Sequence, residues 1–346
     1  MAELITCVAM AQIPSTMRAV QLSAYDGRPE SISVVEMPVP RPGPGEVLVR
    51  VHASPLNPSD DLFIRGLYGF RKPLPTVPGF EGSGTVVEAG RATLARFLNG
   101  KRVACTAAAA NIAGGMWAEY VVVPPPFCAP LRKIVGLDEG ATMLINPLTA
   151  WALIDEARRG GHSAVVQTAA ASSMGQMVIR LGRRFSISVI NVVRRSEQVI
   201  MLQNLGAEHV LNSNDPGFAD SLRKLCHELG AGIGFDAVAG EMSATILRAQ
   251  PRGSRLLVYG MLSMTPSQID PASLIFEDKR VEGFYLVEWL KHKNPLAQLL
   301  LARRIQTFLA NDLKTEIQAR LPLEDVARGL KQYASRMTGG KILVMP

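Results

Sequence analysis

The hydrophobic and polar positions change their period partway along the chain. In the first 130 residues, short apolar or alternating segments are separated by proline and glycine; they predict strands at 17–21, 31–35, 47–53, 79–90, 101–106 and 117–123. Many short strands of this kind indicate a small β-rich domain. Residues 138–159 then show helical spacing, interrupted at Asn146 and Pro147.

From residue 164 onward, predicted strands and helices alternate. Residues 164–167 form a short apolar run, 174–184 carry helical spacing, and 186–193 are rich in β-branched residues. The next expected elements are helix 196–205, strand 209–211, helix 218–229, strand 234–239, helix 244–249, and strands 256–260 and 281–286. This rhythm predicts an α/β fold with a doubly wound parallel sheet.

The last part of the chain is predicted to contain an amphipathic helix, a second helix and a strand, at 295–311, 321–334 and 341–345. The final helix and strand have no room to form a domain of their own. We therefore expect this tail to pack onto the first, β-rich domain.

The turn between the first strand and helix of the alternating region falls where a dinucleotide-binding loop sits. Its small residues would let a helix N-terminus face a pyrophosphate. The candidate cofactor contacts in this turn are Ala171, Ser172, Ser173, Met174 and Gly175. The fingerprint is imperfect, since Ala170 and Ser172 stand where G-x-G-x-x-G has its first two glycines.

Arg194 and Arg195 follow the second strand, where NAD-binding units commonly place an acid that binds the ribose 2′-hydroxyl. Gly175 and Arg194 lie 19 residues apart, close to the expected spacing. Two guanidinium groups suit a 2′-phosphate instead, so the sequence predicts NADPH. The alternative is a buried βαβ unit with two solvated arginines.

Composition narrows the class of protein. The 346 residues are too many for one compact core and indicate two domains. A hydrophobic content of 47% with 19% charged residues is typical of a globular protein. The net charge of +7 comes without a Lys/Arg block, which argues against nucleic acid and for anionic small molecules.

Cysteine usage and hydropathy exclude further classes. The four cysteines form no C-x-x-C pair and have no histidine at ligand spacing, so we expect neither structural zinc nor a disulfide framework. A reducing, cytoplasmic setting fits this usage. The longest uncharged stretch, 160–179, contains several polar residues and predicts no transmembrane helix. Residues 1–16 resemble no secretory or mitochondrial signal and are expected to be a tail, with Met17 as an alternative start.

Taken together, these segments resemble the medium-chain dehydrogenase/reductase superfamily. The resemblance rests on MRAV at 17–20, PGEVLVRV at 44–51, LGAEHVLN at 205–212 and GGKILV at 339–344. It implies a GroES-like β-rich catalytic domain over 17–140 and 291–346, joined to a Rossmann NADPH-binding domain over 141–290.

The zinc-binding positions of this superfamily differ here. Zinc-dependent members carry a cysteine before the first helix and a Gly-His-Glu motif, whereas this chain has LNPSD at 56–60 and Gly79-Phe80-Glu81. A phenylalanine cannot ligate zinc. The chain therefore resembles the zinc-independent reductases, and we expect no metal.

Within that group, the chain is most similar to enoyl thioester reductases of the mitochondrial trans-2-enoyl-CoA reductase type. The motifs are NPSD at 57–60, RGLYGF at 65–70, QTAAASSMGQ at 167–176, INVVRR at 190–195 and LIFEDKRVEGFYLVEW at 274–289. The resemblance implies hydride transfer from NADPH to an α,β-unsaturated carbonyl or 2-enoyl thioester. The alternatives are an NADPH:quinone oxidoreductase and a nucleotide-binding protein without turnover.

The resemblance also suggests roles for residues of both predicted domains. Tyr68 matches the family tyrosine that stabilises the enolate oxygen, although a loop aromatic covering apolar surface is the alternative. Asn57 would contact the nicotinamide or its ribose, unless it only forms a turn. Asn146 and Thr149 are further cofactor candidates.

Three aromatic residues and one glycine complete the candidate site. Tyr259 and Gly260 end a predicted strand, where ligands of α/β sheets bind, and a core tyrosine is the alternative. Phe284 and Trp289 are candidates for the wall of a substrate channel, with core packing as the competing interpretation. The family further implies a homodimer formed through the edge strand at 281–286.

Overall fold

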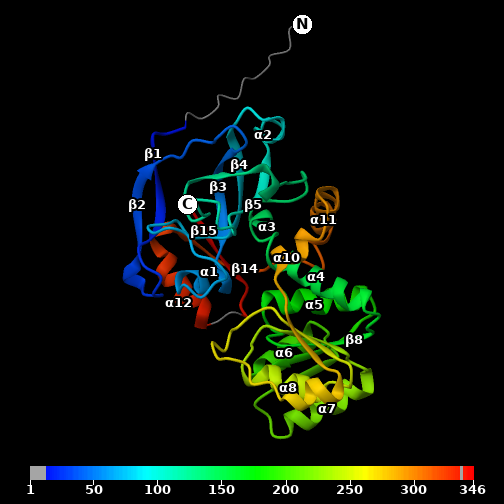
Figure 1. Ribbon diagram of the computed structural model, residues 1–346. Coiled ribbons are helices and arrows are strands. Elements are labelled where there is room, and N and C mark those ends of the chain that lie inside the picture. The colour runs from blue at the N-terminus through cyan, green and yellow to red at the C-terminus, as the bar shows by residue number, and fades with distance from the viewer. Residues whose placement is uncertain (1–12, 336–337) are drawn as a thin grey trace. The chain divides into compact units, whose positions relative to one another are not determined.

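The computed structural model describes residues 13–335 and 338–346, and these fall into two compact units (Figure 1). Unit 1 comprises residues 13–144, 317–335 and 341–346, and unit 2 comprises 145–316 and 338–340. The predicted tail at 1–16 therefore lies mostly outside the described residues. Among the described residues, no helix has both the length and the apolar character that crossing a bilayer requires.

Unit 1 is built on two β-sheets. In the smaller sheet, β1 (Thr16–Leu22) pairs antiparallel with β2 (Ile32–Pro38). The larger sheet has the order β14-β15-β3-β4-β5-β7, and β6 pairs with β3 beside it. Its strands are β3 (Val47–Pro55), β4 (Glu81–Ala89), β5 (Arg102–Thr106), β6 (Tyr120–Val123), β7 (Cys128–Pro130), β14 (Ile317–Pro322) and β15 (Lys341–Met345).

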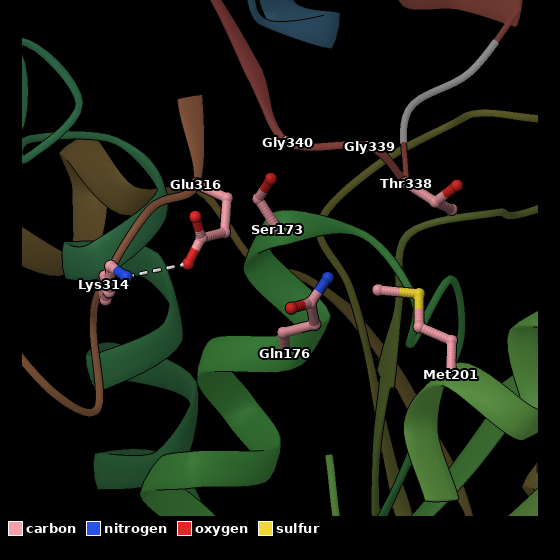
Figure 2. Close-up of a pocket in the computed structure, with 8 residues that line it drawn as sticks. All are labelled: Ser173, Gln176, Met201, Lys314, Glu316, Thr338, Gly339 and Gly340. Atoms are coloured by element: carbon pink, nitrogen blue, oxygen red, sulfur yellow. Dashed lines mark ion pairs between the residues drawn. The ribbon is translucent and has the colours of Figure 1, made fainter. Parts of the chain in front are cut away.

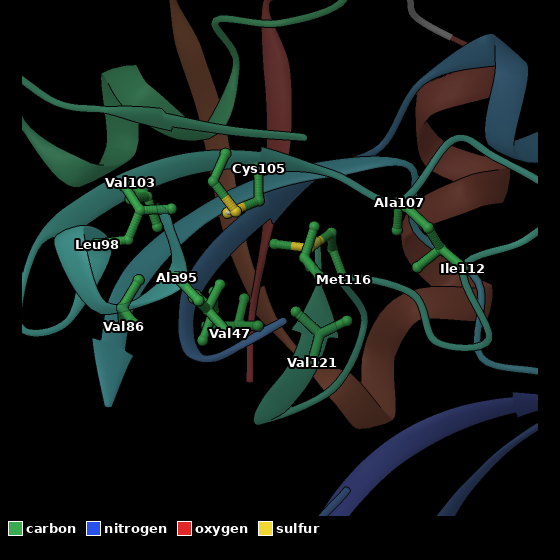
Figure 3. Packing of buried hydrophobic residues seen from close by; sticks show 14 residues of the cluster. Val47, Val86, Ala95, Leu98, Val103, Cys105, Ala107, Ile112, Met116 and Val121 are labelled. Carbon is green, nitrogen blue, oxygen red and sulfur yellow. Dashed lines mark hydrogen bonds between the residues drawn. The ribbon is translucent and has the colours of Figure 1, made fainter. Parts of the chain in front are cut away.

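Short helices connect and cover these strands. They are α1 (Pro58–Ile64), α2 (Thr93–Leu98), α3 (Leu137–Ala141) and α12 (Val326–Ser335), with 3-10 turns at Pro29–Ser31, Pro125–Phe127 and Leu323–Asp325. The main core of unit 1 contains the buried valines of β3 together with Val86, Val103, Val121, Leu98 and Met116 (Figure 3). Apolar residues of β3 and of its neighbours in the larger sheet thus pack together with those of α2 to form this core.

Unit 2 is a parallel sheet with the order β10-β9-β8-β11-β12-β13. Its order reverses at β8, as in doubly wound folds. The four residues of β8 are all buried, which is typical of a strand covered on both faces. The strands are β8 (Ala164–Gln167), β9 (Ser188–Val193), β10 (His209–Asn212), β11 (Ile233–Asp236), β12 (Arg255–Val258) and β13 (Arg280–Gly283).

Helices cover both faces of this sheet (Figure 1). Apolar residues of α5 and α6 form one interior cluster, and those of α7 and α8 form another with the opposite face. The helices of unit 2 are α4 (Asn146–Arg159), α5 (Ser173–Arg184), α6 (Ser196–Asn204), α7 (Phe218–Leu229), α8 (Glu241–Ala249), α9 (Pro271–Glu277), α10 (Leu286–Lys291) and α11 (Pro295–Phe308). The fold class predicted from the sequence is confirmed.

Two predicted elements need correction. The strand expected at 281–286 ends at Gly283, because the carbonyl of Tyr285 accepts a hydrogen bond from the Trp289 backbone N–H in the first turn of α10. The tail contains an additional strand, β14, which pairs in parallel with β15. β14 is an edge strand whose residues are half-buried or exposed, so its polar and apolar residues follow no clear period. Hydrophobic periodicity therefore did not predict it.

The predicted second segment of the catalytic domain, 291–346, is also too long. Residues 291–316 belong to unit 2, and the first boundary lies at 144 rather than 140. The ring of Phe308 on α11 packs 5.4 Å from the ring of Trp151 on α4. Arg184 of α5 pairs with Asp312 at 3.3 Å. These contacts attach α11 to the helical face of unit 2, which its amphipathic pattern alone could not specify.

Gly175 generates a prediction about stability. A Cβ at this position would lie 2.5 Å from the carbonyl oxygen of Ala170, closer than van der Waals contact allows. We expect Gly175→Ala to lower the free energy of unfolding by about 1–3 kcal/mol, because the backbone must shift. Chemical denaturation measures this change.

Gly283→Ala is the matched control, since nothing lies within 4 Å of the Cβ built at Gly283 in the same unit. Its free energy of unfolding should stay within about 0.5 kcal/mol of the wild type. Equal losses in both variants would contradict a role for the close approach of Gly175 to Ala170.

Candidate active site

The cofactor candidates of unit 2 gather at the carboxyl edge of its parallel sheet. The sheet order reverses between β8 and β11, and ligands of doubly wound sheets bind beyond the strand ends at such a point. Ala171 to Gly175 follow β8, Arg194 and Arg195 follow β9, and Tyr259 and Gly260 follow β12. The structure thus brings three separate sequence segments to one edge.

The turn after β8 presents the N-terminus of α5. Ser172 is the N-cap residue, and its Oγ accepts a hydrogen bond from the Gly175 backbone N–H at 3.1 Å. Ala171 and Met174 are buried, so the polar groups that the turn can present are backbone N–H groups of the first helical turn and the Ser173 hydroxyl. Such an end carries partial positive charge and favours an anion.

A small pocket of about 120 Å³ opens beside this turn, within unit 2 (Figure 2). Ser173 and Gln176 reach it from α5 and Met201 from α6, while the rest of its lining is Lys314, Glu316, Thr338, Gly339 and Gly340. The Lys314 ammonium pairs with Glu316 at 3.0 Å. The sequence does not show that these residues line one pocket, because Lys314 and Thr338 lie more than a hundred residues from the turn. Gly339 and Gly340 open the GGKILV motif, but the motif does not indicate that they lie beside α5.

The two arginines after β9 differ in their surroundings. Arg195 is half-buried and forms an ion pair with Glu197 at 3.0 Å. The Arg194 side chain is exposed, and within the described residues its guanidinium has no acidic partner. The Asn214 amide donates to the Arg194 carbonyl at 2.8 Å, and the Arg194 backbone N–H donates to Gln198 at 3.2 Å. The backbone of Arg194 is thus held while its charge faces solvent.

Asp236 is the last residue of β11, which lies between β8 and β12 in the sheet. It binds the segments that follow these strands. Its carboxylate is fully buried and accepts hydrogen bonds from the hydroxyls of Thr168 at 2.8 Å and Ser243 at 2.6 Å. The backbone N–H groups of Val238 and Ala239 also donate to it. Asp236 was not predicted from the sequence, because a single aspartate at a strand end has no distinguishing spacing.

Tyr259 and Gly260 lie directly beside this carboxylate. Both backbone N–H groups donate to the Asp236 carbonyl, at 2.9 and 3.3 Å. Burial raises the pKa of the Tyr259 phenol, and the nearby Asp236 charge adds to that shift, so the phenol stays protonated. A Cβ at Gly260 would lie 2.7 Å from the Ala237 carbonyl oxygen. The backbone of these two residues therefore packs closely on that of Asp236 and Ala237 at the carboxyl edge of the sheet.

The remaining candidates of unit 2 lie on helices or their approaches. Asn146 and Thr149 are half-buried and share one face at the start of α4. Phe284 and Trp289 are half-buried as well, on either side of the start of α10. The Trp289 indole N–H donates to Glu156 at 3.1 Å, and the Lys293 ammonium lies 3.9 Å from its ring centroid. Trp289 is thus oriented by polar partners as well as by packing.

In unit 1, Tyr68 belongs to a cluster of aromatic rings. Its ring centroid lies 4.6 Å from that of Phe80 and 5.2 Å from that of Phe70, and Phe63 packs against both phenylalanines. Tyr68 itself is half-buried. The rings fix the plane of the phenol and give it an apolar setting, where a hydrogen bond from its hydroxyl is stronger than in water.

Asn57 is part of a buried polar network beneath this cluster. The Lys341 ammonium donates to the Asn57 amide oxygen, to the Leu56 carbonyl at 3.1 Å and to the Tyr333 hydroxyl at 3.0 Å. The Asn57 amide nitrogen donates to Glu81 at 3.1 Å. Asn57 and Lys341 are each 1% exposed. The orientation of the Asn57 amide is therefore fixed by one cation and one carboxylate.

Besides Glu81, this region contains a second carboxylate, Asp60, which lies in the first turn of α1 and accepts the backbone N–H of the N-cap residue. It accepts the backbone N–H groups of Asn57 at 2.9 Å and Phe80 at 3.0 Å. Desolvation raises the pKa of Asp60 to about 7, against the opposing effects of these two N–H groups and the Lys341 charge.

The same residues do not form a zinc site. Phe80 has no donor atom, the Asn57 oxygen is taken by the Lys341 ammonium, and no group of metal-binding side chains occurs in the described residues. A cation already occupies the place where a metal would need electron pairs.

Lys72 is an additional buried charge that the sequence analysis missed. It is 5% exposed, and its ammonium donates to the carbonyls of Ala107 at 3.1 Å and Gly114 at 2.7 Å. The Tyr25 hydroxyl both accepts from the Lys72 backbone N–H and donates to its carbonyl, each at 2.8 Å. Burial lowers the pKa of Lys72 to about 8. Lys72 thus joins the loop that carries Tyr68 to the loop at 107–115.

Known protein families match segments of both units. Residues 43–133 match the family model "Alcohol dehydrogenase GroES-like domain", and residues 173–302 match the model "Zinc-binding dehydrogenase". The chain is similar to the mitochondrial enoyl-[acyl-carrier-protein] reductase of Arabidopsis thaliana, with 31% identity over 76% of this chain and 71% of that protein. The relative of the same name from Xenopus tropicalis is 28% identical over 96% of this chain and 97% of its own length.

A solved structure covers the chain almost completely. A protein from Mesorhizobium loti described as an NADPH:quinone reductase aligns with a TM-score of 0.88 at 34% sequence identity. The alignment covers 97% of this chain and 100% of that one. Both names that the sequence analysis weighed, enoyl reductase and quinone reductase, thus occur among the relatives.

Lys72 makes stability depend on alkaline pH. Its ordinary pKa is 10.5 and its folded-state pKa about 8, so between these values the unfolded chain binds a proton that the folded protein does not. The free energy of unfolding therefore gains about 2–3 kcal/mol from this group as pH rises from 8 to 10.5. We expect Lys72→Met to remove that gain, measured as the difference between wild-type and variant denaturation curves at each pH.

Lys133→Met is the matched control, because Lys133 is exposed in the same unit. Its pH dependence should follow the wild type. If the curves of Lys72→Met and the wild type stay parallel across this pH range, Lys72 does not titrate with a lowered pKa.

Proposed function

Because the chain belongs to the medium-chain dehydrogenase/reductase superfamily, we propose that it is an NADPH-dependent oxidoreductase that works without zinc. Its substrate is the activated C=C of an α,β-unsaturated carbonyl compound or a 2-enoyl thioester. The exposed Arg194 guanidinium at the carboxyl edge of the parallel sheet carries this proposal for the cofactor. The aromatic setting of Tyr68, together with the names of the relatives, supports the choice of substrate.

The residues of unit 2 would hold NADPH at three points. The N-terminus of α5, with Gly175 allowing close backbone approach, suits the pyrophosphate. The hydroxyls of Ser173 and Thr338 in the adjoining pocket can donate to phosphate oxygens. Arg194 supplies positive charge for the 2′-phosphate, and Arg195 adds to it from its ion pair with Glu197.

NADPH supplies a hydride for the β-carbon of the substrate, and a proton must then reach the α-carbon. The negative charge that develops on the carbonyl oxygen requires a donor. The Tyr68 phenol carries an O–H group that can donate such a hydrogen bond. Phe70 and Phe80 hold the ring and limit water around it. The buried Lys341 network holds both ends of the Asn57 amide, so in this proposal Asn57 supports the segment before α1, and its contact to the nicotinamide stays a prediction from the resemblance.

Quinone reduction is the second candidate function. The similarity to the Mesorhizobium loti protein, which is described as an NADPH:quinone reductase, favours it. A quinone takes the hydride without needing Tyr68 as an enolate donor, so the two functions differ in their dependence on this residue. A nucleotide-binding protein without turnover is the third candidate, and NADPH binding without oxidation by any acceptor would support it.

A homodimer and a cytoplasmic location remain predictions. β13 is an edge strand of the unit 2 sheet, and its residues are mostly exposed. Such an edge can pair with its symmetry mate and extend the sheet across two subunits. Sedimentation equilibrium would test this pairing. The relatives from Arabidopsis thaliana and Xenopus tropicalis are named mitochondrial, so the location needs direct imaging.

Steady-state NADPH oxidation with crotonyl-CoA and with para-benzoquinone tests the proposed substrate class. We expect turnover of crotonyl-CoA, and a loss of about 100-fold or more in kcat for this substrate in Tyr68→Phe, because the enolate loses its donor. The rate with para-benzoquinone should change by only a few-fold.

Tyr120→Phe removes a hydroxyl from another half-buried tyrosine of unit 1 and serves as the control. It should leave both rates unchanged. Turnover of the quinone without turnover of crotonyl-CoA would refute the proposed reaction in favour of quinone reduction.

The arginine pair gives a separate test of the cofactor. We expect the double variant Arg194→Ala/Arg195→Ala to raise the Kd for NADPH by about 100-fold and to change the Kd for NADH little, because only NADPH carries the 2′-phosphate. Arg194→Ala alone should account for most of the loss, since Arg195 is partly neutralised by Glu197. Fluorescence titration of both cofactors measures these constants.

Arg252→Ala removes an exposed charge from the same unit and is the control for nonspecific electrostatics. Its affinities for both cofactors should stay within a factor of two or so of the wild type. Equal losses for NADPH and NADH in the double variant would rule out binding of the 2′-phosphate by these arginines.

A further inference from the structure

Two cysteines that are distant in the sequence face each other in unit 1. Cys105 on β5 and Cys128 on β7 are directly opposite in the antiparallel register of these strands. Their sulfur atoms lie 3.4 Å apart. Local sequence patterns do not indicate this pair, because its members lie 23 residues apart with the whole of β6 between them.

The hydrogen-bonding pattern shows which kind of opposing pair this is. The Leu131 backbone N–H donates to the Arg102 carbonyl at 2.9 Å, so Arg102 and Leu131 form a hydrogen-bonded pair. Pair types alternate along antiparallel strands, and three steps along this register lead to Cys105 and Cys128. They therefore occupy a non-hydrogen-bonded pair, where the Cα atoms are only about 4.5 Å apart and the side chains approach most closely.

This geometry suits a covalent link. Disulfides in proteins span Cα separations of about 4.4–6.8 Å, which includes the separation typical of such a pair. The sulfurs need to approach each other by little more than an ångström, because a disulfide bond is about 2 Å long. Rotation of two side chains achieves this, and the backbone pairing of β5 and β7 can stay as it is.

We propose that Cys105 and Cys128 form a reversible dithiol–disulfide pair whose oxidant is hydrogen peroxide. The Cys128 thiolate attacks the peroxide oxygen, the O–O bond breaks, and a sulfenic acid forms while one water leaves after protonation. The Cys105 sulfur then attacks the sulfenic sulfur, the S–O bond breaks, and a second water leaves. Two thiols and one hydrogen peroxide molecule thus give one disulfide, with loss of two protons and two electrons from the thiols.

The order of attack follows from the surroundings of each sulfur. Cys128 is 9% exposed, whereas Cys105 is fully buried in the hydrophobic core (Figure 3). Burial, together with the neighbouring Cys128 sulfur, raises the pKa of the Cys105 thiol. Cys128 is therefore the residue that an oxidant meets first, and Cys105 is placed to resolve the sulfenic acid.

The pair is also connected to the candidate site within unit 1. The two residues after Cys105 hold the Phe80 carbonyl, through the Thr106 hydroxyl at 2.9 Å and the Ala107 backbone N–H at 2.8 Å. Phe80 packs on Tyr68. A cross-link at Cys105 would fasten the end of β5 that supports this contact.

The test is to count thiols in the intact, folded protein before and after hydrogen peroxide, using N-ethylmaleimide labelling under denaturing conditions. The chain has four cysteines, so the label count should fall by two. Peptide mapping without reductant should show the segment around Cys105 linked to that around Cys128, and dithiothreitol should restore both labels. The midpoint of thermal unfolding should rise in the oxidised form, because the cross-link constrains the unfolded chain.

Cys226→Ala is the matched control, since Cys226 is a buried cysteine of unit 2. This variant should still lose two labels, whereas Cys105→Ala and Cys128→Ala should give no linked peptides. The proposal is overturned if the wild-type protein keeps both thiols under peroxide that oxidises the denatured chain. Oxidation of Cys128 to sulfinic acid without the cross-link would overturn it as well.

Discussion

Both units depend on the same constraint, which is that polar groups removed from water must find partners inside the protein. A buried charge without partners costs several kcal/mol, and a buried hydrogen-bonding group costs somewhat less. In unit 1 the Lys341 ammonium is satisfied by Leu56, Asn57 and Tyr333. In unit 2 the Asp236 carboxylate is satisfied by two hydroxyls and by backbone N–H groups. Each network fixes a part of the backbone that carries candidate site residues.

The Lys341 network also explains why the end of the chain returns to unit 1. β15 begins at Lys341, and the ammonium bonds to residues at the end of β3 and before α1. Strand pairing between β15 and β3 adds backbone hydrogen bonds in the same place. The ammonium and the strand pairing thus join the last strand of the chain to the segment between β3 and α1.

The contrast between satisfied and unsatisfied charges separates structural residues from binding residues. Lys72, Lys341 and Asp236 are buried, and each is held by several hydrogen-bond partners inside the protein, so these side chains connect segments of the fold. Arg194 is exposed and without an acidic partner in the described part of the chain, so its charge is available to a ligand. For Cys105 and Cys128, the contact between the two sulfur atoms is the geometry from which we propose a disulfide.

The sequence by itself determined the fold class, the alternating elements of unit 2 and the segments that carry the turn, the arginine pair and Tyr68. These follow from local periodicity and from short motifs, which depend on neighbours along the chain. The tertiary structure alone decided that α11 packs on unit 2, that β13 ends at Gly283, and that Lys72, Asp236 and Lys341 anchor the candidate site. It also decided that Cys105 meets Cys128. Contacts of this kind join residues far apart in sequence, and a buried polar side chain is distinguished only by the partners that folding brings to it.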